Sequence, residues 1–182
     1  VYAYLQRGED DKALKIVADI HELKGPFQAH ASAAYALGAA EARTLLERQQ
    51  WAKAAELEPR NPEHFEWDKY PEFEALSHFA IGLGAARSNQ IRKAQDAVGD
   101  MSRLQQKVTN PYWKEQIEIQ KESINAWILF SQNKKEEALD RMKSAAQKEA
   151  ATNKHAVTPG EVGKEKVEGV LPPARRRRFH SA

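Results

Sequence analysis

The chain has 182 residues, of which 41% are hydrophobic and 30% are charged, so it can bury a core and still dissolve in water. It contains no cysteine, which excludes a disulfide scaffold, a thiolate zinc site, an iron–sulfur cluster and a cysteine nucleophile. The net charge is +2, but six basic and two acidic residues give 163–182 a charge of +4, so residues 1–162 carry −2. Because no folded face gathers the basic side chains, we expect no nucleic-acid partner.

The pattern of residues predicts an all-α chain. The long stretches between prolines are rich in strong helix formers, and no run alternates like a strand. Asn110-Pro111 is typical of a helix start, since Asn caps the first turn and Pro fits the first helical position. In chain order we predict helices over residues 1–7, 10–24, 27–47, 50–57, 72–88, 90–107, 111–132 and 134–151. The longest strongly apolar run, 126–130, is far shorter than the roughly 20 residues that span a bilayer, so we expect no membrane partner.

Two segments fall outside the predicted helices. Residues 58–71 are rich in proline but carry Phe65, Trp67 and Tyr70, which favours an ordered aromatic loop packed on the helices. Residues 152–182 show no helical period, and we expect an irregular basic tail in which Arg175 to Arg178 are solvated. The predicted helical domain is therefore 1–151. Because Val1 already falls in a helix and no initiator Met precedes it, we expect the chain to begin within a longer protein.

Four turns between paired helices share one pattern. In each turn a Gly, Asn or Gln ends the first helix, and an Ala follows five positions later. Gly and Asn tolerate the left-handed conformation at a helix C-terminus, and the small Ala lets the second helix pack closely on the first. The four pairs are Gly8 with Ala13, Gln49 with Ala54, Asn89 with Ala94, and Asn133 with Ala138. Three of the turns also have a small residue seven positions earlier, namely Ala42, Gly82 and Ala126.

These spacings resemble those of the tetratricopeptide-repeat (TPR) family, over roughly residues 1–151. The alanines recur after 41, 40 and 44 residues, against about 34 in the standard unit. The family's Trp in the first helix is replaced by Gly38, His78 and Glu122. The chain is similar to bacterial TPR proteins of unassigned activity. The resemblance implies helix hairpins stacked into a short right-handed superhelix, an α-solenoid, whose concave face binds a protein or peptide.

The resemblance also implies which positions face the groove. The residues six before the turn are Arg43, Leu83 and Trp127, and those two before it are Glu47, Arg87 and Ser131. We single out Arg43, Arg87 and Trp127, because arginine and tryptophan dominate interface hot spots and guanidinium groups pair with carboxylates. The alternative is that both arginines pair with neighbouring Glu residues while Trp127 fills the core. A second candidate surface is the loop with His64, Trp67 and Tyr70.

A metal-binding or enzymatic function is the alternative from another class. Glu74 and His78 stand four apart on one helix face, and His64 precedes the aromatic loop, so the three could share a metal. Without Cys or a His-x-x-x-His pair, an ion pair or a packed histidine is the simpler interpretation. Gly82-Leu-Gly84 lies within a helix and lacks the third glycine of a dinucleotide loop. We therefore predict no catalytic residue, metal or cofactor. We assign the chain to the cytoplasm, with the periplasm and the oligomeric state left open.

Overall fold

The computed structural model describes residues 1–25 and 27–152, and the predicted basic tail beyond Thr152 lies outside this part. The described residues form helices and no strand, which confirms the all-α prediction. None of these helices is long and apolar enough to cross a membrane. The elements are α1 (Tyr2–Arg7), α2 (Asp10–His21), α3 (Ala31–Glu47), α4 (Trp51–Ala55), the 3-10 turn η1 (Trp67–Lys69), α5 (Pro71–Arg87), α6 (Ile91–Lys107), α7 (Pro111–Ser131) and α8 (Lys135–Ala151).

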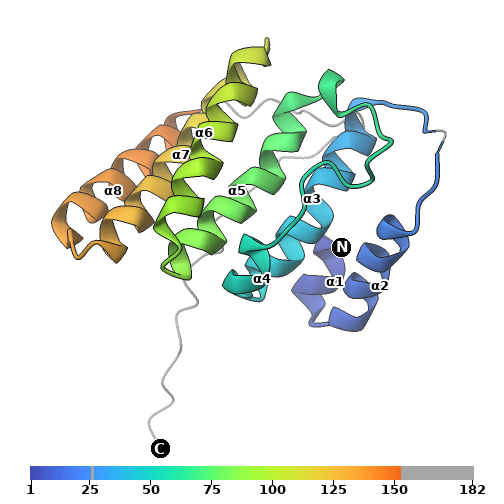
Figure 1. Ribbon diagram of the computed structural model, residues 1–182, viewed down its shortest axis with the longest axis horizontal. Helices are drawn as coiled ribbons and strands as arrows, with labels where there is room; N and C mark the ends of the chain where they lie inside the picture. The colour runs from blue at the N-terminus through green and yellow to red at the C-terminus, as the bar shows by residue number, and fades with distance from the viewer. Residues whose placement is uncertain (26, 153–182) are drawn as a thin grey trace, which may run out of the picture.

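The helices lie side by side from α1 and α2 to α8 (Figure 1), and α1 packs on α2, α3 on α4, α5 on α6 and α7 on α8. The four turn residues adopt the expected left-handed conformation, with φ of 74° at Gly8, 54° at Gln49, 60° at Asn89 and 63° at Asn133. The alanine five positions after each turn is buried. The largest difference from a predicted boundary is at α3, which begins at Ala31 rather than 27, because the His30 side chain caps it by accepting a hydrogen bond from the Ala33 N–H. Helices α2 and α4 also end earlier than predicted, at His21 rather than 24 and at Ala55 rather than 57.

Helix α5 occupies the centre of the described part and packs against α3, α4, α6 and α7. Its sequence is apolar on nearly every side, as expected of a fully buried helix. Gly84 lets α4 approach the α5 backbone closely. A Cβ at Gly84 would lie 2.5 Å from the Trp51 carbonyl oxygen and 2.7 Å from the Ala55 nitrogen.

Two apolar clusters of the core contain or contact the candidate site residues. The main cluster joins α4 to α7 and includes the fully buried Met101, Ile117 and Ile124. A second cluster lies beneath the loop between α4 and α5, where Phe65 and Trp67 are buried with Phe73 of α5. The Trp67 indole N–H donates a 3.0 Å hydrogen bond to the Pro62 carbonyl oxygen, across a loop that contains a cis Asn61–Pro62 bond.

Candidate binding surface

The guanidinium of Arg87, in the last turn of α5, rests on two indole rings. Its Cζ lies 4.6 Å from the centroid of Trp51, the first residue of α4, and 3.9 Å from that of Trp127 in α7. Both distances fall within the range of cation–π contacts. Partial burial lowers the pKa of Arg87 from its usual value, and no ion pair joins this group to a carboxylate in the described part of the chain. The Arg87 guanidinium is therefore held in place by aromatic rings and pairs with no carboxylate of the described residues.

The neighbouring helices fix this arrangement. Close packing at Gly84 brings the start of α4, and with it Trp51, against α5. On the other side, the Ser131 hydroxyl lies 3.0 Å from the Ala86 carbonyl oxygen and holds the end of α7 beside the end of α5. Trp127 is half-buried and packs against the main core cluster. The positions of both indoles therefore follow from helix packing rather than from loop conformation.

An exposed aromatic residue extends the surface. Phe130 is 50% exposed, and its ring contacts Trp127 edge to face, with centroids 5.5 Å apart. We call the group of Trp51, Arg87, Trp127 and Phe130 the arginine–tryptophan surface. It combines the Arg87 cation of α5 with three aromatic side chains, one from α4 and two from α7.

Arg43 lies on α3 with different neighbours. Its Nη2 donates a 3.3 Å hydrogen bond to the Tyr35 hydroxyl, and its Cζ lies 5.0 Å from the Tyr2 ring centroid. Like Arg87, it forms no ion pair among the residues that the structure describes. The alternative in which both arginines pair with neighbouring Glu residues is therefore wrong. The same alternative expected Trp127 to fill the core. This expectation holds in part, because Trp127 packs on the core cluster and also contacts Arg87.

The structure separates the residues of the loop surface. His64 is exposed, and Tyr70 is half-buried with its ring 5.9 Å from Phe65 and 6.4 Å from Phe73. Trp67 is only 1% exposed, so it belongs to the core beneath the loop and offers no surface to a partner. The predicted aromatic loop does pack on the helices, but its sequence did not distinguish the buried Trp67 from the half-buried Tyr70, because the packing involves α3 and α5.

His78 lies between two carboxylates. Its Nε2 is 3.8 Å from Glu74 Oε1, and its Nδ1 is 3.6 Å from Asp100 Oδ2 of α6. Glu74 is buried, and its other oxygen lies 3.7 Å from Arg60. The exposed His64 side chain makes no hydrogen bond or ion pair with either residue. Among the described residues no group of three or more His, Asp or Glu side chains could hold a metal ion.

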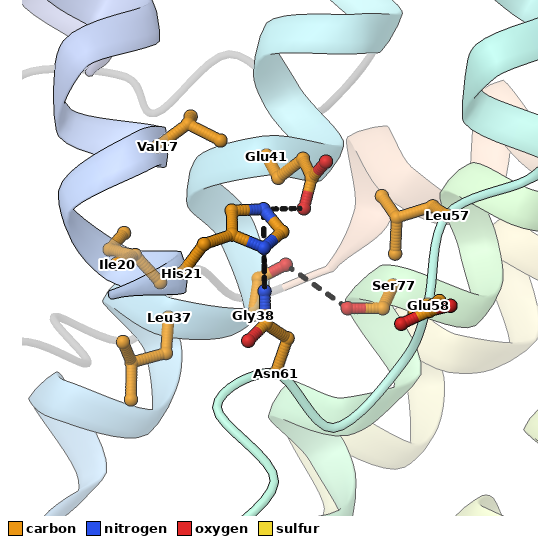
Figure 2. A pocket seen from close by; sticks show the side chains of 10 residues that line it. All are labelled: Val17, Ile20, His21, Leu37, Gly38, Glu41, Leu57, Glu58, Asn61 and Ser77. Carbon is orange, nitrogen blue, oxygen red and sulfur yellow. Dashed lines mark hydrogen bonds and ion pairs between the residues drawn. The ribbon is translucent and has the colours of Figure 1, made fainter. Parts of the chain in front are cut away.

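A further polar group was missed by the sequence analysis. His21, at the end of α2, has its Nε2 2.9 Å from Glu41 Oε2 of α3 and its Nδ1 2.9 Å from the Asn61 amide nitrogen (Figure 2). In the tautomer that carries its proton on Nε2, Nδ1 accepts the hydrogen bond from the Asn61 amide and Nε2 donates one to Glu41. These residues line a pocket of about 10 Å³, room for roughly one water molecule. They come from three separate elements, and no local sequence signal links them.

Comparison with known proteins adds no relative. No family model matches the chain, and neither the curated proteins nor the solved structures include a match. The resemblance to TPR repeats therefore stays a prediction, supported by the turns and their buried alanines.

Proposed function

We propose that the chain is a protein- or peptide-binding scaffold of the TPR-like kind. In this proposal the four hairpins form a short right-handed superhelix, and the first helices of the pairs line its binding face. The support is the equivalence of the four turns in conformation and in the buried alanine that follows each one. The first helices of the four pairs form one continuous face only if the hairpins stack in chain order.

The observation that carries the proposal is the unpaired guanidinium of Arg87 on its two indoles. A surface arginine normally has free access to water or a nearby carboxylate. Arg87 is exposed, but the indoles cover part of its guanidinium, and no carboxylate of the described residues pairs with it. The rings also restrict its rotamers, so less conformational entropy is lost when a ligand pairs with it.

The chemistry of Arg87 favours a peptide that bears a carboxylate. A planar guanidinium can donate two parallel hydrogen bonds to one carboxylate, and such charge-assisted pairs are about twice as strong as neutral ones. Beside it, Phe130 and Trp127 form an apolar surface on which the neighbouring side chain of the peptide can pack. The pocket in Figure 2, by contrast, is far smaller than the several hundred cubic ångströms typical of a site for an organic substrate.

Selection of a random peptide library on the full chain tests the proposal. We expect enrichment of peptides with Asp or Glu next to an apolar residue. Arg87→Ala should weaken their binding about tenfold, through loss of the charge-assisted hydrogen bonds, while the melting temperature stays near that of the parent. Arg92→Ala is the matched control, since it removes the same charge from an exposed position on α6. Equal losses in both variants, or no enriched peptide, would contradict the proposal.

A further inference from the structure

The hairpin of α1 and α2 shares little apolar surface with the rest of the molecule. Its two helices bury only Leu5 and Ala13, whereas α5 buries fourteen of its seventeen residues. The three apolar clusters formed by the described residues contain no residue before Phe27. Detachment of this hairpin would therefore expose little of the core.

Polar contacts hold the hairpin to α3 near its turn. The Arg48 guanidinium, just after α3, binds both carboxylate oxygens of Asp10, and its Nη2 also donates a 2.8 Å hydrogen bond to the Leu5 carbonyl oxygen. The Gln6 amide donates a 3.1 Å hydrogen bond to Glu47. The Arg48 contacts are partly buried and the Gln6 contact is exposed, so water competes for these partners and the contacts stabilise the protein less than apolar burial does.

The other end of the hairpin is held at His21. The ring joins α2 to Glu41 of α3 and to Asn61 of the loop (Figure 2). Beside it, Val17 and Ile20 of α2 line the small pocket opposite Leu37 and Leu57. The apolar side chains between α2 and its neighbours do not fill this space completely. The hydrogen bonds of His21 therefore join α2 to α3 and the loop where apolar packing is incomplete.

We propose that the α1–α2 hairpin opens as a unit while α3 to α8 stay folded, and that Arg48–Asp10 and His21 with Glu41 and Asn61 are its two latches. The nine residues between His21 and Ala31 are long enough to allow this movement without unfolding α3. Opening would also lift the Tyr2 ring from Arg43. Opening would therefore give a ligand better access to Arg43. This consequence rests on the proposed function, whereas the opening itself does not.

Hydrogen exchange of the full chain, followed by mass spectrometry, tests the opening. We expect amides of α1 and α2 to exchange at least about a hundredfold faster than those of α5, with a weaker dependence on denaturant. Arg48→Met should speed exchange in α2 roughly tenfold further and leave α5 unchanged. Arg103→Met is the matched control, because this exposed guanidinium pairs with Asp100 on α6, far along the chain from the hairpin.

A cross-link separates opening of the hairpin from fraying of short helices. The chain has no cysteine, so Gln6→Cys with Glu47→Cys can be joined selectively by a short bis-maleimide. The cross-link should slow exchange of the α2 amides from Ala13 to Ile20, which lie away from the joined residues. Unchanged α2 exchange after cross-linking would mean that the helix frays by itself and would overturn the proposal. Exchange of α2 at the same rate as α5 would overturn it too. Neither result depends on any peptide binding.

Discussion

The helices α5 and α2 show two ways in which a helix joins the same array. Helix α5 is apolar on almost every side and contacts four other helices, so its place is set by packing. Helix α2 buries one alanine and is held by side-chain hydrogen bonds at its ends. Burial of apolar surface contributes far more free energy than exposed polar contacts, so stability falls from the centre of the array toward this end. The arginine–tryptophan surface lies on the stable part.

The largest expected difference between the two regions comes from removal of apolar volume. Ile124 of α7 is fully buried and touches the glycine face of α5. Ile124→Ala should lower the free energy of unfolding by about 3 kcal/mol, from lost burial and the cavity left behind. Leu14→Ala on α2 removes a side chain that is 51% exposed and should change it by less than about 0.5 kcal/mol. Urea denaturation measures both, and similar losses would refute the gradient in stability.

A second pair of variants tests the close approach of α4 and α5. Gly84→Ala places a Cβ 2.5 Å from a backbone oxygen, and we expect a loss of about 2 kcal/mol from overpacking. At Gly99 of α6, the same change meets only the Arg103 side chain at 3.7 Å. Gly99→Ala should therefore stabilise the protein by about 0.5–1 kcal/mol, through reduced entropy of the unfolded chain. The two melting temperatures should shift in opposite directions, and a shift of the same sign would be inconsistent with this packing.

These contrasts also explain what the sequence could predict. The turn residues Asn89 and Asn133 were identifiable because the left-handed conformation favours Gly and Asn, and Gln49 was identifiable from its equivalent spacing to the following Ala. The helices were identifiable from their period and composition. The repeat alignment placed Arg87 and Trp127 on one face, but it did not predict the contact with Trp51, which lies 36 residues away and meets Arg87 only through helix packing.

Two further residues mark the limit of local inference. Trp67 was expected to pack on the helices as part of an aromatic loop, but its nearly complete burial against Phe65 and Phe73 depends on tertiary packing. His21 carries no local signal for its partners Glu41 and Asn61, which helix packing brings to it. Position in a loop or on a helix therefore says little about whether a side chain meets solvent, core or a distant polar group.

Acid provides a smaller effect on the hairpin. The hydrogen bond from Arg48 holds the pKa of Asp10 below its usual range. The stabilisation from this pair is complete above the unfolded-state pKa, about 3.9, and is lost as the pH falls through the lower folded-state value. Exchange in α2 should thus accelerate relative to α5 below about pH 4. Asp10→Asn should remove most of this pH dependence, and a parent-like profile in that variant would assign the effect to another group.

The smallest expected effect lies at a turn between the two regions. Gln49 has φ of 54°, a conformation that costs a residue with a side chain about 1 kcal/mol relative to glycine. Because glycine also gains entropy in the unfolded chain, Gln49→Gly should stabilise the protein by only about 0.5 kcal/mol. Gln50 is the matched control, since its φ is −81°, where glycine brings no relief. Gln50→Gly should destabilise by a similar amount. Thermal melts of the two variants should move apart by a few degrees, and loss of stability in both would mean that the Gln49 side chain contributes more to the turn than its backbone strain removes.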